Sequence, residues 1–293
     1  MTTSTEAIQS ESRILNPQDT VEAVLILSRD QAEAAIAVQN AAQSIATAAE
    51  NAAYHLKQGG RLIYAGAGTS GRLAALDAAE LPPTFSWPLN RSISLLAGGT
   101  AAEWTAQEAA EDDAGAGFNE ADVLNPTRHD VFILVTASGR TPYTLGVLKR
   151  AQLAGALTIG IANNAGSPLL EQSDCPILLE TGPEVINGST RLKAGTAQKI
   201  TLNTLSCAIM LRLGKIYNNL MVDMKATNQK LYNRAIQMVL ACVDATPEQA
   251  REALEHCDWQ VKTACVMIKR GLGVDESRLL LDQHDWNLND LCL

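Results

Sequence analysis

The centre of the chain alternates short apolar segments with segments of helical periodicity. Each apolar segment has hydrophobic residues at successive positions and is followed by turn residues, as expected for parallel strands covered by helices on both faces. These segments are RLIYAG at 61–66, SISLLAG at 92–98, VFILVTA at 131–137, LTIGIAN at 157–163 and CPILLE at 175–180. The pattern predicts an α/β fold with a mostly parallel sheet and helices on both faces.

Helical patterns flank this region. Apolar residues recur at helical spacing from about Thr20 to Lys57, and Gly59-Gly60 ends that pattern. The chain becomes helical again after about Lys193. We therefore expect helices before and after the sheet.

The last part of the chain contains its own helix signals. Thr246-Pro247-Glu248-Gln249 combines an N-cap, a proline at the first helical position and a capping-box glutamine. Two more starts are predicted at Asp258 and Asp275, with Gly271 as a stop. The predicted divisions are an N-terminal helical arm at 1–52, an α/β domain at 53–216, and a helical region at 217–293 with a three-helix unit at about 244–293.

Composition and charge exclude several classes of protein. The chain has 293 residues, 46% of them hydrophobic, and a net charge of −9, so a nucleic acid partner is not expected. Its six cysteines form no Cys-x-x-Cys pair, so neither a zinc site nor a disulfide framework is predicted. No leader or membrane-spanning run is evident, and we expect a cytoplasmic protein without a membrane partner.

The first candidate binding loop follows the first predicted strand. Gly66-Ala67-Gly68-Thr69-Ser70-Gly71 matches the dinucleotide fingerprint, but the next strand ends without the acidic residue that would hold a ribose. We therefore expect Gly68, Thr69 and Ser70 to bind one phosphate group at a helix N-terminus. The structural alternative is a tight strand-to-helix turn with Ser70 as the cap.

The second candidate loop follows the third predicted strand. Ser138, Gly139, Arg140 and Thr141 precede Pro142, which suits a first helical turn. Hydroxyls and free backbone N–H groups would converge there on an anion. Ligands of open α/β sheets lie outside the carboxyl ends of the strands, where both loops are expected.

A third polar segment precedes the helix predicted after the sheet. Ser189 and Thr190 would contribute hydroxyls and Lys193 a positive charge to the same phosphorylated ligand. The alternative is an ordinary N-cap followed by a solvated lysine.

Two glutamates are the candidate catalytic residues. Pro82 and Pro83 are expected to end a helix whose last turn carries Glu80. The helix dipole should then make that carboxyl hold its proton more tightly, as suits a general acid. Glu111 belongs to an acidic group expected to close the next helix before Gly115. The alternative for that group is a solvated helix end. Glu103 is predicted to complete a capping box with Thr100 and is assigned to structure.

Four long motifs, in order, resemble those of the N-acetylmuramic acid 6-phosphate etherases, a bacterial family with the sugar isomerase fold. The motifs are RLIYAGAGTSGRLAALDAAELPPTF, AAEDDAGAG, TASGRTPY and GSTRLKAGTAQK. The family cleaves a lactyl ether without a metal or nucleotide cofactor. The resemblance implies a homodimer, with Glu80 as the acid, Glu111 as the second catalytic glutamate and a ubiquitin-associated-like fold at the C-terminal end. From the chemistry of the elimination we assign the base to Glu111.

One departure from the family concerns the N-terminal arm. Relatives usually carry a longer arm, whereas the residues before Leu15 do not match its pattern. We expect this difference to reduce or change activity if the arm completes the site of a partner subunit.

Three other functions remain open at this stage. The first is a non-catalytic regulator that senses a sugar phosphate, as in the related glucokinase regulatory protein, and the second is an aldose–ketose phosphate isomerase. A nicotinamide enzyme comes last. Retention of both Glu80 and Glu111 favours the etherase over the regulator.

Overall fold

The computed structural model describes residues 5, 7, 15–105, 107–224, 226 and 228–291. The chain forms two compact units, which are treated separately below. The sheet unit comprises Met1–Ala79 and Asn90–Ser206, and the helical unit comprises Glu80–Leu89 and Cys207–Leu293. The predicted departure in the N-terminal arm falls mostly outside the described residues.

The sheet unit is built on five parallel strands. They are β1 (Leu62–Gly66), β2 (Ser92–Leu96), β3 (Val131–Val135), β4 (Leu157–Ala162) and β5 (Cys175–Leu178), in the spatial order β2-β1-β3-β4-β5. Strands β1, β3 and β4 are buried at every position, as their continuous apolar sequences require. The α/β fold with a parallel sheet is confirmed.

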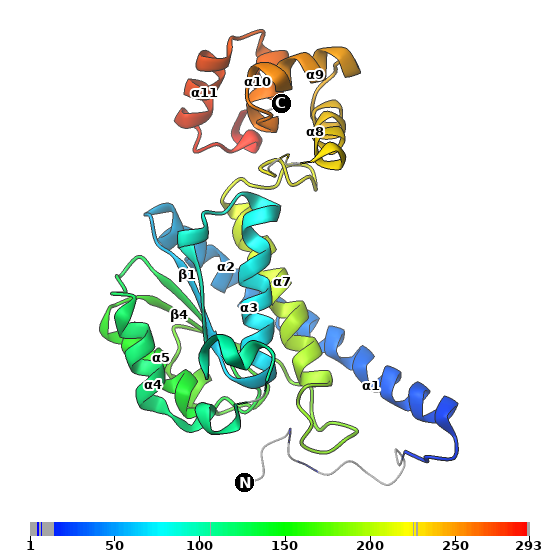
Figure 1. Ribbon diagram of the computed structural model, residues 1–293, viewed down its shortest axis with the longest axis vertical. Coiled ribbons are helices and arrows are strands. Elements are labelled where there is room, and N and C mark those ends of the chain that lie inside the picture. The colour runs from blue at the N-terminus through cyan, green and yellow to red at the C-terminus, as the bar shows by residue number, and fades with distance from the viewer. Residues whose placement is uncertain are drawn as a thin grey trace. The chain divides into compact units, whose positions relative to one another are not determined.

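Helices cover both faces of the sheet. One face, with Ile63 and Phe132, packs against α4 and α5, which lie side by side in Figure 1. Tyr64 is on the other face, where its hydroxyl donates to Asp77 of α3 at 2.9 Å. The helices of this unit are α1 (Thr20–Asn40), α2 (Ala42–Lys57), α3 (Gly68–Phe85), α4 (Ala114–Val123), α5 (Pro142–Leu153), α6 (Pro168–Gln172) and α7 (Lys193–Arg212); α3 and α7 continue into the helical unit.

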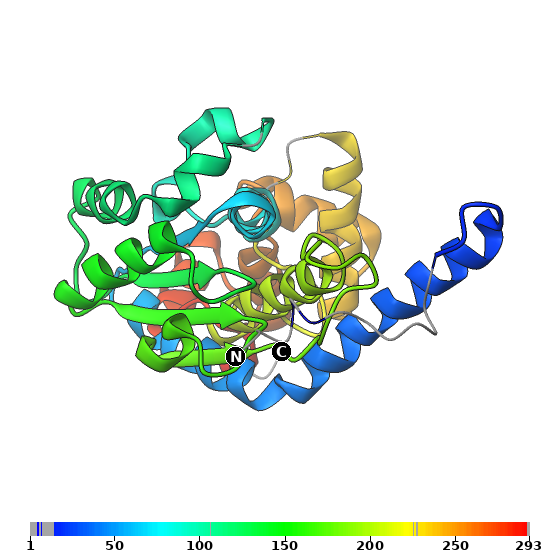
Figure 2. The ribbon, with the colours of Figure 1, turned by 90° about the horizontal axis from the view of Figure 1, so that it is seen from below.

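Helix α1 extends beyond the sheet in both views (Figures 1 and 2). In its first turns, Val21, Val24 and Leu25 are spaced so that they lie on one face of the helix, and Val21 is 72% exposed. An apolar face of this kind is unusual on a helix surrounded by water.

The helical unit contains α8 (Gln229–Cys242), α9 (Pro247–His256), α10 (Val261–Arg270), α11 (Val274–Gln283) and the 3₁₀ turn η6 (Leu288–Leu291). The predicted capping box between Thr246 and Gln249 is confirmed, and Gly271 ends α10 in the left-handed conformation. The two other predicted starts are displaced, because α10 begins after Gln260 and α11 after Gly273.

The prediction that Pro82 and Pro83 end α3 is wrong. The helix continues through both prolines to Phe85. A proline at position 82 removes the N–H that would bond to the carbonyl of Ala78, and the hydroxyl of Ser92 donates to that carbonyl at 2.8 Å instead. Glu80 therefore lies before the last turn of α3, which removes the geometric basis of the dipole argument.

The prediction of one helix from Thr100 to the acidic group Glu111-Asp112-Asp113 is also wrong. Two 3₁₀ turns, η4 (Gly99–Glu103) and η5 (Glu108–Asp112), occupy this segment, and η4 has no side-chain cap. Asp113 is the N-cap of α4, with its carboxylate accepting from the N–H of Ala116 at 2.8 Å. Gly117 lies within α4, where a Cβ would stand 2.1 Å from the carbonyl oxygen of Tyr143. This glycine serves helix packing rather than helix termination.

Candidate active site

The order in which strands are added to the sheet reverses between β1 and β3. From β1 the chain moves outward to β2, then returns to β3 and continues to β4 and β5. Ligands of open parallel sheets bind at such a switch point, outside the carboxyl ends of the strands. Gly66 and Val135 pair in register at these ends, so the two loops predicted to bind an anion begin side by side.

The first loop is shaped by contact between backbones. A Cβ on Gly71 would lie 2.6 Å from the carbonyl oxygen of Gly66, so the start of α3 approaches β1 as closely as backbones allow. The glycine spacing therefore has a packing role, but Ser70 is not the cap of the structural alternative, because α3 already begins at Gly68. Gly68, Thr69 and Ser70 form the first turn of α3, whose N–H groups have no intrahelical partners.

The second loop gathers hydroxyl groups at the end of β3. The Thr136 Oγ1 lies 2.7 Å from the Thr141 Oγ1 and 3.4 Å from the Ser138 Oγ. The backbone N–H of Arg140 donates to the Ser138 Oγ at 3.1 Å, and Gly139 has a φ of +67°. Thr141 is the N-cap of α5 but makes no side-chain cap bond, which leaves the N–H groups of that helix end available.

The third segment lies beside the first loop. The N–H of Gly195 on α7 donates to the carbonyl oxygen of Thr190 at 2.9 Å. The Cβ position of the same glycine is 3.4 Å from the Cγ2 of Thr69. The turn that carries Ser189 and Thr190 is thus close to the start of α3.

Lys193 requires a correction. Its ammonium group is 2.9 Å from Asp30 and 3.0 Å from Glu33, both on α1, and its side chain is only 2% exposed. The lysine is therefore held by an internal ion pair, not by a position that faces a ligand. We omit Lys193 from the proposed substrate contacts.

Glu184 occupies the N-terminus of α7. Its carboxylate accepts from the backbone N–H groups of Lys193 and Ala194, both at 2.9 Å. Burial raises the pKa of Glu184 above its ordinary value, although these hydrogen bonds act in the opposite direction. A protein carboxylate thus already fills this helix N-terminus.

Sequence reasoning missed a buried amide network at the end of β4. The Gln198 side chain donates to the Asn163 Oδ1 at 2.9 Å, and the Asn164 side chain donates to the carbonyl oxygen of Ala137 at 2.9 Å. Asn164 also donates to the Thr5 hydroxyl at 2.9 Å. Two asparagines directly after an apolar strand were the available signal, because buried amides need hydrogen-bond partners.

The two candidate catalytic glutamates are both exposed. Glu111 lies in η5, which packs against α5 of the sheet unit. Glu80 lies on α3, in the segment that belongs to the helical unit.

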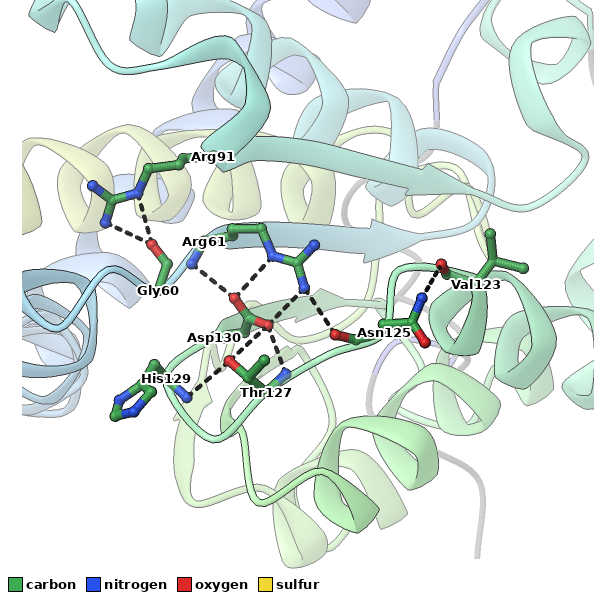
Figure 3. Close-up of polar contacts among 8 residues, drawn as sticks. All are labelled: Gly60, Arg61, Arg91, Val123, Asn125, Thr127, His129 and Asp130. Carbon is green, nitrogen blue, oxygen red and sulfur yellow. Dashed lines mark hydrogen bonds and ion pairs between the residues drawn. The ribbon is translucent and has the colours of Figure 1, made fainter.

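An ion pair joins the amino ends of β1 and β3 (Figure 3). The guanidinium of Arg61 contacts Asp130 through Nη2–Oδ2 at 2.7 Å and Nε–Oδ1 at 3.0 Å. Burial alone would raise the pKa of Asp130. Hydrogen bonds from the Arg61 side chain and from the N–H groups of Thr127 and Arg61 outweigh burial and hold that pKa below its ordinary value.

Metal ligation and membrane insertion find no support in the part of the chain that the structure describes. Within those residues, no three His, Cys, Asp or Glu side chains are grouped to hold a metal ion. None of the described helices is sufficiently long and apolar to cross a bilayer.

Comparison with known proteins assigns most of the chain. Residues 44–152 match the N-terminal SIS domain of glucokinase regulatory protein, residues 102–207 match the SIS domain, and residues 218–270 match the C-terminal lid domain of glucokinase regulatory protein. An N-acetylmuramic acid 6-phosphate etherase of Deinococcus radiodurans is 57% identical over 78% of this chain and 74% of its own. Etherases of Rubrobacter xylanophilus and Vibrio vulnificus are 46% and 43% identical over 94% and 96% of this chain, and 91% and 94% of their own.

Proposed function

The chain belongs to the N-acetylmuramic acid 6-phosphate etherase family, and on that premise we propose how its residues divide the reaction. It is a carbon–oxygen lyase that converts N-acetylmuramic acid 6-phosphate and water into N-acetylglucosamine 6-phosphate and D-lactate in cell-wall sugar recycling. The observation that carries the proposed residue roles is the meeting of two hydroxyl-rich loops at the β1/β3 switch point.

These loops hold the phosphate end of the sugar. The first turn of α3 offers N–H groups with the hydroxyls of Thr69 and Ser70, and the second loop adds Ser138 and Thr141. Helix N-termini favour anions, so a phosphate at this edge needs no metal ion to compensate its charge. A fixed phosphate also holds the sugar carbons in one position for proton transfer.

Elimination then requires one base and one acid. In the open-chain sugar the aldehyde at carbon 1 acidifies the proton at carbon 2, which Glu111 removes. The electron pair left on carbon 2 forms a double bond to carbon 3 as the carbon–oxygen bond to lactate breaks, and Glu80 protonates the departing oxygen. Water then adds its hydroxyl to carbon 3 and a proton to carbon 2, which gives the product.

From the length of α3 we infer that Glu80 acts on the substrate of a second copy of the chain. Glu80 follows Gly68 by twelve residues in one continuous helix, a rise of about 18 Å. This distance exceeds the length of a hexose phosphate anchored at Gly68. We therefore propose a homodimer in which each site combines Glu111 from one subunit with Glu80 from the other.

The exposed face of α1 provides a surface for that association. Val21, Val24 and Leu25 would be covered by the second subunit, as expected for apolar residues at an obligate interface. We place the enzyme in the cytoplasm, where the thiols of cysteines 175, 242, 257 and 265 stay reduced.

Subunit mixing tests the shared site. D-lactate release should be lost in Glu80→Gln and in Glu111→Gln, and retained in Asp112→Asn, the matched control on η5. Mixing the two inactive proteins after reversible dissociation should restore about a quarter of wild-type activity, because half of the dimers are mixed and each has one intact site. Activity that stays absent in a demonstrated mixed dimer would place both glutamates in one subunit.

The same assay separates the other functions. Saturable binding of N-acetylmuramic acid 6-phosphate without lactate release would indicate a sugar-phosphate regulator. Formation of a ketose from a hexose phosphate would indicate an isomerase, which needs no acid for an ether oxygen.

A further inference from the structure

Two turns in the helical unit have the same unusual backbone. Asp258-Trp259 follows α9 and Asp285-Trp286 follows α11, and all four residues have positive φ between 50° and 60°. In both turns the tryptophan N–H donates 2.8 Å to a leucine carbonyl of the preceding helix. Successive non-glycine residues in this conformation cost free energy, and such strain concentrates at functional positions.

Both turns direct a tryptophan to one cavity. The cavity has a volume of about 680 Å³, and Trp259, Trp286 and Tyr232 contribute to its lining. The rings of Tyr232 and Trp259 meet edge to face with their centroids 4.4 Å apart. A cavity of this size is typical of small-molecule sites and far exceeds the space needed by a simple ion.

Positive charge is concentrated in the same wall. The ammonium groups of Lys215 and Lys262 both lie 2.8 Å from the Oδ2 of Asp223, and all three residues line the cavity. Asp258, the other acidic residue of the lining, pairs with Arg278 at 3.0 Å. Two ammonium groups that share one carboxylate oxygen have hydrogen-bond donors to spare and leave one positive charge in excess.

The buried lysine makes this excess charge costly without a ligand. The Lys262 side chain is only 2% exposed. Burial lowers the pKa of Lys262, Asp223 opposes that shift and Lys215 adds to it. An anion bound beside the two lysines would neutralise the excess charge.

We propose that this cavity is a binding site for a phosphate monoester carried on a ring, with the phosphate at Lys215 and Lys262 and the ring against Trp259 and Trp286. The spare N–H donors of the two ammonium groups suit phosphate oxygens, and the aromatic side chains suit either a sugar or a nucleobase ring. None of these residues belongs to the catalytic proposal, so the site serves a second ligand.

Tryptophan fluorescence tests the site directly. In the intact protein, Trp87→Phe and Trp104→Phe leave Trp259 and Trp286 as the reporters of the four tryptophans. Titration with N-acetylglucosamine 6-phosphate or adenosine monophosphate should give a saturable change, at least about tenfold tighter than with inorganic phosphate. The better of the two ring phosphates identifies the sugar or the nucleotide as the source.

Matched variants connect the signal with the cavity. Lys262→Met should weaken binding at least about tenfold, whereas Lys269→Met, an exposed lysine on the same helix, should not change it. Because Lys262 is buried, Lys215→Met gives the same test at a more exposed position, and thermal melting shows whether each variant is folded. Ser70→Ala combined with Ser138→Ala should leave the signal intact.

Any of three results would overturn the proposal. The first is the absence of saturable change with both ring phosphates. The second is unchanged affinity in folded Lys215→Met and Lys262→Met. The third is loss of the signal in the Ser70/Ser138 variant, which would assign the response to the etherase site. None of these measurements depends on etherase activity.

Discussion

Arg61 and Asp130 hold together the amino ends of the two strands whose carboxyl ends form the candidate phosphate site (Figure 3). Leu62 pairs with Val131 next to the ion pair, and Gly66 pairs with Val135 next to the loops. Because the strands are parallel and in register along this length, an ion pair at one end helps to position the two loops at the other.

Asp130→Asn should destabilise the protein by about 2–4 kcal/mol, since it removes the charge that Arg61 pairs with while burial remains. The pKa of Asp130 is below its ordinary value of 3.8 in the folded state, so its stabilising contribution is present above pH 3.8 and is lost as the pH falls through the lowered value. Urea unfolding at several pH values measures both effects. Asp122→Asn, which removes a pair with a 58% exposed carboxylate, should cost less than about 1 kcal/mol.

Gly117→Ala should cost about 1–3 kcal/mol, because its Cβ would stand 2.1 Å from a backbone oxygen of α5 and the two helices would have to separate. Gly115→Ala in the same helix meets only the Asp113 side chain, at 3.2 Å, and should change stability by less than about 1 kcal/mol. Thermal unfolding compares the pair. Equal effects would show that α4 and α5 do not need this close approach.

Lys193→Met should destabilise the sheet unit by about 3–5 kcal/mol, because it leaves Asp30 buried without its lysine. The double variant Lys193→Met/Asp30→Asn should recover part of that loss. Denaturant unfolding of these variants measures the coupling free energy between Lys193 and Asp30. A Lys193→Met protein with normal stability and a raised KM would restore the original prediction that this lysine contacts substrate.

Thr246→Ala should lower the stability of the helical unit by about 1 kcal/mol, because it removes the side-chain half of the capping box at the start of α9. The unfolding of this unit can be followed through the fluorescence of Trp259 and Trp286. Glu252→Ala, an exposed position of the same helix, should have a smaller effect.

The strands were predictable because burial on both faces leaves continuous apolar runs, as in Val131–Val135. The ends of helices were less predictable where a distant group decides them. The hydroxyl of Ser92 donates to the carbonyl that Pro82 leaves without a helical partner. Asp113 caps α4, and Gly117 of the same helix allows the close approach of α5. Asp113 is local to the helix that it caps, but Ser92 and the α5 backbone at Tyr143 are distant partners that the local pattern does not show.

The candidate site was predictable where local sequence determines it. Turn residues at the ends of strands located the loops of Ser70 and Ser138. The ammonium group of Lys193 was expected to face a ligand, but it pairs with Asp30 of α1, more than 150 residues earlier in the sequence. The asparagines after β4 were an available signal for buried amides, but their partner Gln198 lies 35 residues from Asn163, and only the tertiary structure brings the two together.

Because of the order of the strands, the substrate loops come together only late in folding. The paired strand ends at Gly66 and Val135 do not exist in a nascent chain until β3 has inserted beside β1, after β2 and the segments around it have been synthesised. Partial opening of this seam would therefore abolish substrate affinity while most helices are still intact, so loss of activity on heating should precede loss of the helical circular dichroism signal.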